Sequence, residues 1–311
     1  MPAVSVVIPV YNAEEFISET LESVLAQTYK DWEIITVNDG SKDRSLAILK
    51  KYKKRLGPRM RIIDQKNAGV SAARNRAIRA ARGRYIAFLD HDDLWDPTKL
   101  EKQVGLFEKN RKLGLVYSDT CVIDARGKLK RRSLLHGRAY RGDVFHQMLD
   151  YNFISMSAVM VTKQALKKVG LFNPKYRTVE EYDLWLRITR EFPADLVAEP
   201  LERYRVHGGM FSRFVELSAQ EELEIIGNWL KKHRTTREFR KKRYARIYFR
   251  TGWALYRQGE FKKSVRWFRR AMRKSPSYYK TYIALPFALL RTRLLLKLVY
   301  ALESRFNFIR F

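Results

Sequence analysis

The 311-residue chain has almost no cysteine and no apolar run of membrane-spanning length. Its single Cys121 excludes a disulfide within the chain and fits a reducing compartment. Neither a Cys-X-X-Cys nor a His-Glu-X-X-His pattern occurs, which argues against the usual zinc sites. The apolar run Ile283–Leu290 is too short to cross a bilayer. Because no basic segment precedes the first strand-like run, we expect no secretory signal peptide.

Acidic residues are scarce in the last quarter of the chain. Residues 230–311 contain 24 Lys and Arg but only 3 Asp and Glu, so +21 of the net charge of +29 lies there. This asymmetry indicates a separate module that faces lipid headgroups or nucleic acid, and a solvated basic surface without a partner is the alternative. With 46% hydrophobic residues, the chain is long enough for one large domain and an appendage.

Three carboxylates end a strand-like stretch in the first third of the chain. The apolar run Tyr85–Leu89 stops at Asp90, Asp92 and Asp93, in the order D-H-D-D. Ligands bind at the carboxyl ends of strands in open α/β sheets, and carboxylates there can hold a hard divalent cation beside a phosphate. The alternative is a solvated acidic turn in front of the next helix.

Strands and helices alternate ahead of these acids. We expect strands at Val4–Val10, Glu33–Val37 and Arg61–Asp64, and helices at Glu14–Gln27, from a Ser41 cap to about Tyr52, and at Gly69–Ala81. This order predicts an α/β fold with a mostly parallel sheet that helices cover on both faces. Asp39 and Asp90–Asp93 would then lie on one rim of the sheet.

Several motifs give the first two thirds of the chain a family resemblance. They read V-S-V-V-I-P-V-Y-N-A-E at 4–14, L-A-Q-T-Y at 25–29, V-N-D-G-S at 37–41, N-A-G-V-S-A-A-R-N at 67–75, F-L-D-H-D-D-L-W at 88–95, E-E-Y-D-L-W-L-R at 180–187 and Y-R-V-H at 204–207. In these motifs the chain resembles glycosyltransferase family 2. The resemblance implies a Rossmann-like GT-A domain over 1–215 and leaves 216–311 as an all-helical basic region.

The resemblance implies an inverting transfer of a sugar from a nucleoside diphosphate sugar to an acceptor hydroxyl. It places Pro9, Tyr11, Asn12 and Glu14 around the nucleotide and assigns Asp39 to the base, with uracil favoured. A carboxylate can accept the ring N–H, and a tyrosine offers a face for stacking. The alternative for Asp39 is that it only shapes a turn.

Three further residues belong to the same implied donor site. Gly69 lets the backbone pass close to the ligand. Arg74 and Asn75 occupy positions that contact ribose or phosphate in relatives.

Asp90 and Asp92 match the Asp-X-Asp element of the family. In that pattern the first acid faces the ribose or the water shell of the metal, and the second binds Mg²⁺ or Mn²⁺ on the diphosphate. We therefore expect Asp92, with Asp90 beside it, to hold the metal. We expect His91 to point outward. His207 is a further candidate for the metal or diphosphate, and an ordinary surface or core histidine is the alternative.

The motif at 180–187 carries the catalytic assignment. Relatives have an aspartate as general base at its second position, where this chain has Glu181. A carboxylate there takes the proton of the acceptor hydroxyl as the oxygen attacks the anomeric carbon. The extra methylene of glutamate bears on the geometry of the reaction. Asp183 is the second candidate, with a capping or pairing role in the helix as the alternative.

The resemblance does not explain the tail. Residues 252–276 resemble one tetratricopeptide-like helix pair, which must pack on neighbouring helices or on another chain, as in an oligomer. Residues 282–301 place Arg291, Arg293 and Lys297 among leucines, a pattern typical of a helix in a membrane surface. A helical extension packed on the enzyme is the alternative. Nucleic acid binding rests on charge alone and is disfavoured.

Together these features predict a Mn²⁺- or Mg²⁺-dependent transferase that uses a nucleotide-sugar donor and a glycan or lipid-linked acceptor. We expect it in the cytoplasm, peripheral on the inner face of the cell membrane. The alternative is a non-catalytic nucleotide-binding or scaffold protein that uses its basic tail for membrane or nucleic-acid contact.

Overall fold

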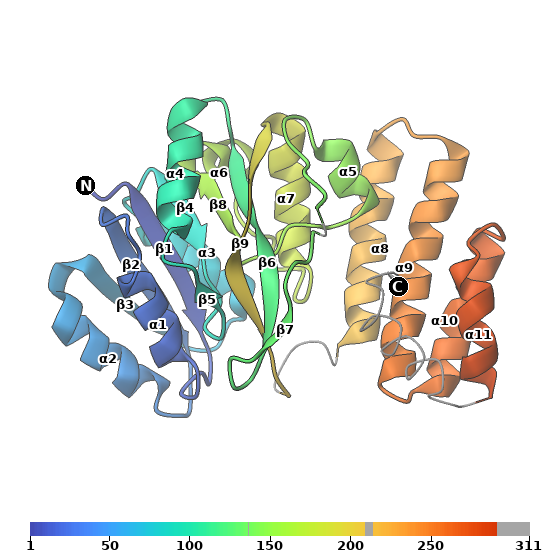
Figure 1. Ribbon diagram of the computed structural model, residues 1–311, viewed down its shortest axis with the longest axis horizontal. Coiled ribbons are helices and arrows are strands. Elements are labelled where there is room, and N and C mark those ends of the chain that lie inside the picture. Colours follow the sequence, from blue (N-terminus) through green and yellow to red (C-terminus); the bar gives the residue numbers. More distant parts are fainter. Residues whose placement is uncertain (136, 209–213, 291–311) are drawn as a thin grey trace. The chain divides into compact units, whose positions relative to one another are not determined.

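The computed structural model describes residues 1–135, 137–208 and 214–290. The chain divides into two compact units, Met1–Met210 and Phe211–Phe311. The first contains a sheet with helices, and the described part of the second is helical (Figure 1). The domain boundary predicted between residues 215 and 216 stays a prediction.

Nine strands of the described residues form one sheet in the order β3-β2-β1-β4-β8-β6-β9-β5, with β7 paired to β6. Strands β3, β2, β1 and β4 are parallel, as are β6 and β9, whereas β8 runs antiparallel to both of its neighbours. The bounds are β1 Val4–Val10, β2 Trp32–Asp39, β3 Met60–Gln65, β4 Tyr85–Phe88, β5 Leu94–Trp95, β6 Leu115–Asp124, β7 Leu129–Arg131, β8 Val159–Thr162 and β9 Ala194–Val206.

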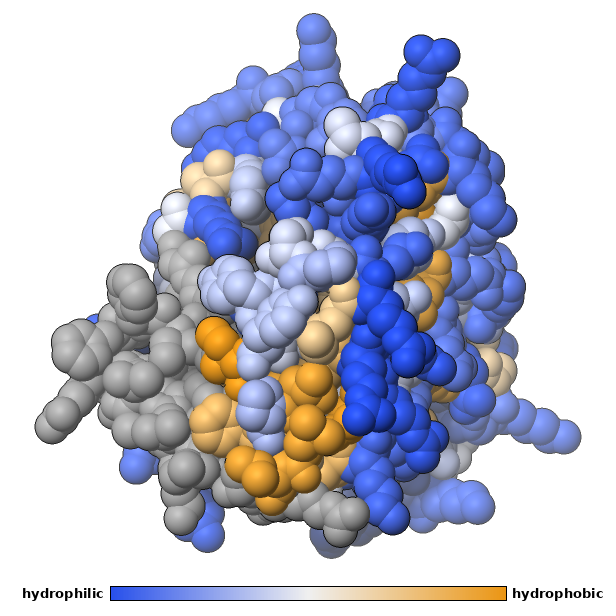
Figure 2. Space-filling model, turned by 90° about the vertical axis from the view of Figure 1, so that its right-hand side faces the viewer, coloured by the Kyte–Doolittle hydropathy of each residue, from blue (hydrophilic) through white to orange (hydrophobic). Residues whose placement is uncertain are grey.

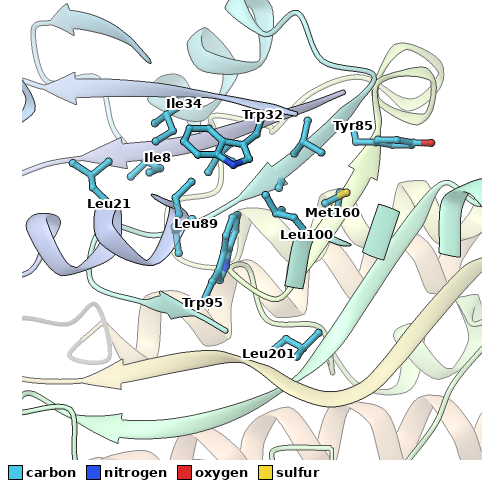
Figure 3. Packing of buried hydrophobic residues seen from close by; sticks show 14 of the residues in the cluster. Ile8, Leu21, Trp32, Ile34, Tyr85, Leu89, Trp95, Leu100, Met160 and Leu201 are labelled. Carbon is cyan, nitrogen blue, oxygen red and sulfur yellow. The ribbon is translucent and has the colours of Figure 1, made fainter. Parts of the chain in front are cut away.

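Helices cover both faces of this sheet, as predicted. Their bounds are α1 Ile17–Leu25, α2 Ser45–Leu56, α3 Val70–Ala80, α4 Lys99–Lys109, α5 Phe145–Asp150, α6 Lys163–Val169 and α7 Glu180–Glu191, with a 3-10 turn at Gly57–Arg59. Alternate residues of β1 and β2 pack with α1, α2 and α4 in one core, where Ile8, Leu21, Ile34 and Leu100 lie together (Figure 3). On the other face, Phe88 of β4 contacts Trp185 of α7 at 5.8 Å between ring centroids.

Some elements differ from the sequence-based expectation. The second helix begins at Ser45, and Ser41 does not cap it, because its Oγ accepts the backbone N–H of Asn12 at 3.0 Å. Strands β5, β7 and β9 and helix α5 were not predicted. The long β9 matters most for the site, because it ends next to His207.

The helical unit contains α8 Val215–Lys232, α9 Arg237–Arg257, α10 Phe261–Lys274 and α11 Lys280–Leu289. Helices α9 to α11 share a small core that includes Phe249 and Phe268. The helix pair expected over 252–276 does not begin at Gly252: α9 runs through this glycine, where a Cβ atom would lie 2.7 Å from the Phe268 ring.

The expected membrane-surface helix lies only partly within the described residues. Its first part belongs to α11, and the prediction for Arg291, Arg293 and Lys297 falls outside the described residues. Among the helices that the structure describes, none combines the length and the apolar character needed to cross a bilayer.

Candidate donor and metal site

Polar side chains gather at the carboxyl ends of the parallel strands. In the sheet register Val10 of β1 lies opposite Asn38 of β2, and Val7 lies opposite Phe88 of β4. Asp39 and the acids that follow Phe88 therefore reach the same rim, which confirms the expected placement.

Asp92 and His207 form the candidate metal pair. His207 Nε2 lies 2.9 Å from Asp92 Oδ2, and each side chain keeps 17% of its surface exposed. The guanidinium of Arg205 donates from Nε to the Asp92 backbone carbonyl at 2.7 Å, so the ends of β4 and β9 are tied together. This link explains why residues so far apart in the sequence meet.

The residues present fit a divalent cation that also binds phosphate. Within the described residues, no three His, Cys, Asp or Glu side chains are grouped closely enough to hold a metal by themselves. Asp92 and His207 would supply two ligands. Mg²⁺ commonly keeps only one or two protein ligands and takes the others from substrate phosphates and water. A metal that joins the protein to a diphosphate needs no more than this pair.

Asp93, one of the three strand-end carboxylates expected to be able to hold a cation, has both of its oxygens engaged by protein groups. It is buried, with Oδ2 accepting the Ser157 hydroxyl at 2.6 Å and Oδ1 accepting the Arg205 backbone N–H at 2.9 Å. The backbone N–H of Asp90 donates to the same Ser157 oxygen at 3.0 Å. Burial, and next the charge of Asp92, raise the pKa of the Asp93 carboxyl well above its usual value. Asp93 thus fixes the loop that carries the other two acids.

Arg74 connects the strand-end acids to α7. It is buried, and it donates to Asp90 at 2.6 Å and to Glu180 at 2.5 Å. Burial alone would lower the pKa of the Arg74 guanidinium, but the charges of Asp90 and Glu180 raise it above its usual value. The family resemblance predicts a ribose or phosphate contact for Arg74 and no role for Glu180. Helix α3 is rich in small residues, and this composition is the one feature of the sequence that indicates that the Arg74 side chain is enclosed by its surroundings.

Glu181 and Asp183 have different surroundings in the first turn of α7. Glu181 keeps some exposure and accepts one hydrogen bond, from Asn152 Nδ2 at 3.2 Å. Burial, followed by the charge of Glu180, raises the pKa of Glu181 to about 8. Asp183 instead pairs with Arg187, with 2.7 Å between Oδ2 and Nη2. The pairing alternative for Asp183 is what the structure contains.

The first motif forms a turn at the end of β1. Tyr11 is 44% exposed, and Asn12 has a left-handed backbone with a φ of 48°. The Asn12 Oδ1 accepts the backbone N–H of Lys42 at 2.8 Å. Glu14 accepts both the backbone N–H and the side-chain Nε of Arg44, and these bonds lower the pKa of Glu14. An exposed ring beside an ordered turn suits stacking on a base.

The carboxylate of Asp39 organises the loop before α3. Its Oδ1 accepts Gln65 Nε2 at 2.7 Å and the Ala68 N–H at 2.8 Å, and its Oδ2 accepts the Gly69 N–H at 2.9 Å. Gly69 has a φ of 88°, which favours glycine, and no atom lies within 4 Å of the position that a Cβ would take. Asp39 can shape this loop and also accept a hydrogen bond from a nucleotide base, because a carboxylate accepts about four hydrogen bonds.

The remaining candidates are held by backbone groups. Asn75 donates to the Phe172 carbonyl at 2.8 Å and accepts the Phe172 N–H at 2.9 Å, so its amide secures the segment before α7. His91 does not point into solvent as expected. It is partly buried, with Nδ1 3.3 Å from the carbonyl oxygen of Pro9.

Acids at the strand ends of a mixed α/β sheet, beside a helix with a second set of carboxylates, are suited to binding and activating a nucleotide-linked substrate. The pattern described as Glycosyl transferase family 2 matches residues 5–170, and the chain belongs to this family. It is a nucleotide-sugar-dependent glycosyltransferase of an inverting family.

Curated relatives agree with this assignment. An uncharacterized glycosyltransferase of Rickettsia typhi is 32% identical over 244 residues, which cover 76% of this chain and 74% of the relative. The putative teichuronic acid biosynthesis glycosyltransferase TuaG of Bacillus subtilis is 33% identical over 207 residues, which cover 66% of this chain and 79% of the relative.

Solved structures support the fold. TarS residues 1–349 of S. aureus, in complex with UDP, align with a TM-score of 0.62 at 16% identity, over 94% of this chain and 88% of that one. The mannosyltransferase PcManGT of Pyrobaculum calidifontis, in complex with GDP-Man and Mn²⁺, aligns with a TM-score of 0.63 at 16% identity, over 99% of this chain and 88% of that one.

Proposed function

We propose that the chain is a metal-dependent inverting glycosyltransferase that moves a sugar from a UDP-sugar to a hydroxyl of a glycan or lipid-linked acceptor. The observation that carries this proposal is the ion-paired path from Asp90, two residues before Asp92, through Arg74 to Glu180, next to Glu181. It links a diphosphate-binding group to a carboxylate suited to deprotonate an acceptor. Family membership favours an enzyme over a non-catalytic binding protein.

In this proposal Asp92 and His207 would hold Mn²⁺ or Mg²⁺ beside the donor diphosphate. When bound, the ion offsets the negative charge that the departing diphosphate gains. Arg74 holds the Asp90 carboxylate, and the Ser157 hydroxyl accepts the Asp90 backbone N–H. Held in this way, Asp90 would face the ribose or the water shell of the ion. The Mn²⁺ and GDP-Man in the Pyrobaculum enzyme support a divalent cation at such a site.

Glu181 is the proposed general base. Its carboxylate takes the acceptor proton while the acceptor oxygen attacks the anomeric carbon from the side opposite the diphosphate, which inverts that carbon. The Glu181 carboxylate accepts a hydrogen bond from the neutral amide of Asn152, whereas Asp183 is engaged by two nitrogens of the Arg187 cation. A base must leave its ion-pair partner to accept a proton, so this difference favours Glu181.

The donor nucleotide is proposed to lie between the first motif and the loop before α3. Tyr11 offers a ring for stacking, Asp39 accepts the ring N–H of uracil, and Gly69 allows close approach. Pro9, Asn12 and Glu14 shape that turn. UDP bound to TarS, which shares the fold, is consistent with uracil. Asn75 would contact the donor only by giving up its bonds to Phe172.

We also propose that the enzyme works at the cytoplasmic face of a membrane, where lipid-linked acceptors are found. The basic C-terminal region supports this location, with a net charge of +21 over residues 230–311.

Donor hydrolysis is the direct test of the catalytic proposal. The full-length chain is incubated with UDP-, GDP- and dTDP-linked sugars and Mn²⁺, and released nucleotide is measured with and without EDTA. We expect nucleotide release from a UDP-sugar, and this release should depend on the metal. When an acceptor sugar is present, Glu181→Gln should slow the release. Release from GDP-sugars alone would overturn the uracil assignment, and no release from any donor would overturn the proposed activity.

A further inference from the structure

Helix α10 presents a cationic surface that the core of the helical unit does not use. Its buried residues include Trp267 and Phe268, and the helix contains no acidic residue. All seven of its basic side chains are exposed: Lys262, Lys263, Arg266, Arg269, Arg270, Arg273 and Lys274.

Four of these cations have no ion-pair or aromatic partner among residues 1–135, 137–208 and 214–290. Lys263 lies 3.4 Å from Glu260, while Arg270 and Lys274 lie over aromatic rings, 4.8 and 4.7 Å from the ring centroids. The other four follow the spacing i, i+4, i+7 and i+11, which places them on one face of the helix. No carboxylate of the described chain pairs with any member of this cationic stripe, which comprises Lys262, Arg266, Arg269 and Arg273.

A second stripe, on α11 and at its two ends, is apolar and exposed. Each of its five residues is between 43% and 75% exposed, and the helical spacing places all five on one face of the helix. Its opposite side buries Thr281, Ala284 and Ala288. Figure 2 shows the side of the molecule on which α11 lies in Figure 1, and a hydrophobic patch lies there beside a hydrophilic ridge. The apolar stripe comprises Tyr279, Tyr282, Ile283, Leu289 and Leu290.

The two stripes belong to helices that pack on each other through one core. Phosphate groups of nucleic acid would use the cations but would leave the aliphatic side chains in water. An acidic protein partner would need its own apolar surface to match. The interface of an anionic bilayer offers both phosphate groups and acyl chains, and tyrosine suits the boundary between them.

We infer that α10 and α11 form a docking surface for an anionic lipid bilayer. The cationic stripe faces the headgroups, and the apolar stripe enters the boundary between headgroups and acyl chains. This inference deepens the membrane location proposed above and rests on it, but lipid binding requires neither donor nor metal.

The size of the effect follows from the charges. A basic side chain near an anionic membrane strengthens partitioning about fivefold, so removal of four should weaken it by more than about 10²-fold. The attraction is screened over a Debye length of about 8 Å at physiological ionic strength, so binding should fall as salt rises.

The test is co-sedimentation of the full-length chain with vesicles, without donor or metal. One set contains equal parts phosphatidylglycerol and phosphatidylcholine, and the other contains phosphatidylcholine alone. The charge variant changes the cationic stripe: Lys262→Gln, Arg266→Gln, Arg269→Gln and Arg273→Gln. Its matched control removes four exposed charges from the first unit: Lys50→Gln, Lys51→Gln, Lys54→Gln and Lys109→Gln.

The apolar variant is Ile283→Ser with Leu290→Ser, and its control is Leu129→Ser with Leu134→Ser, two exposed leucines of the first unit. Thermal melting by circular dichroism verifies that each variant is folded. We expect the wild type and both controls to bind the anionic vesicles and not the neutral ones, and we expect each stripe variant to lose binding.

Other results overturn the inference. Undiminished vesicle binding by either stripe variant places the membrane contact elsewhere. A second result would indicate a nucleic-acid surface instead of a membrane surface. In that case the wild type binds random double-stranded DNA but no vesicles, the charge variant loses DNA binding, and the apolar variant keeps it. A concentration-dependent dimer that the apolar variant abolishes, measured by sedimentation velocity, assigns the apolar stripe to a second copy of the chain. Donor hydrolysis, measured separately, shows whether the catalytic proposal stands.

Discussion

His207 and Asp92 lie 2.9 Å apart, between Nε2 and Oδ2, although 115 positions separate them in the sequence. Strand β9 makes the contact possible by running parallel to β6 and delivering its last residues to the rim where β4 ends. A histidine and a carboxylate at this distance can share a proton or bind one cation together.

If the pair holds the metal, Asp92→Asn should lower metal-dependent donor turnover by about 10²-fold or more, because it removes ligand charge and almost no volume. His207→Gln should raise the Mn²⁺ concentration needed for half-maximal turnover by roughly 10–100-fold. Manganese titrations of donor hydrolysis measure both effects, with the exposed Glu101→Gln as the control. An unchanged Mn²⁺ dependence in both variants would remove the pair from the metal site.

The general-base assignment separates Glu181 from Asp183. Glu181→Gln should lower kcat by roughly 10²–10⁴-fold with little change in donor affinity, because an amide cannot accept the proton. Asp183→Asn should instead act through the Arg187 contact and lower stability more than kcat. Steady-state kinetics beside urea unfolding distinguish the two. A severe loss of kcat in Asp183→Asn, with a mild one in Glu181→Gln, would reverse the assignment.

The pH dependence follows from the raised pKa of Glu181. The base acts only when ionised, and burial with the charge of Glu180 puts its pKa at about 8. The value of kcat/KM should therefore rise with pH, up to tenfold per unit below this pKa, and level off above it. A profile that stays flat through this range would exclude Glu181 as the titrating base.

The raised pKa of Glu181 also makes folding stability depend on pH, but stability should fall as pH rises, whereas activity should increase. The pKa of Glu181 rises from 4.5 to about 8 on folding, so its contribution to stability is present below pH 4.5 and is lost as pH rises toward 8. The variant Glu181→Gln has no such titration. It should gain stability relative to wild type as pH rises through this window, measured by urea unfolding.

The position of the site was predictable from the sequence, but its internal contacts were not. The apolar run Tyr85–Leu89 ends in acids, and this pattern indicates where a strand stops. The pattern does not indicate which side chains contact one another in the site. Arg74 reads as a phosphate ligand because a buried arginine between two carboxylates leaves no periodic signal. Strand β9 was missed because charged residues and Pro200 interrupt its alternation.

Arg74→Met tests whether this buried bridge matters for stability. It leaves Asp90 and Glu180 without their cation, and breaking a buried ion pair costs about 3–5 kcal/mol in unfolding free energy. Arg79→Met, on an exposed turn of the same helix, is the matched control and should cost less than about 0.5 kcal/mol. Urea unfolding measures both. Equal stability of the two variants would show that the Arg74 pairs contribute nothing net.

The helical unit offers a test in which two opposing effects have similar size. Gly252 lies inside α9, where alanine would normally gain about 1 kcal/mol of helix propensity. A Cβ there would lie 2.7 Å from Phe268 Cδ1 and 2.8 Å from Cε1, and this ring is fully buried. Overpacking of a core costs typically about 1–3 kcal/mol. The steric cost should prevail, so we expect Gly252→Ala to destabilise the chain.

Gly227 of α8 is the matched control, because the nearest atom to its added Cβ is the Tyr244 hydroxyl oxygen at 3.5 Å, an ordinary contact. Gly227→Ala should therefore stabilise the chain by up to about 1 kcal/mol. Thermal melting of both variants and of Gly252→Ala with Phe268→Leu completes the test. The smaller leucine should recover part of the loss, because it removes the ring that the new methyl group meets. Stabilisation by Gly252→Ala alone would mean that α9 and α10 are not packed this closely.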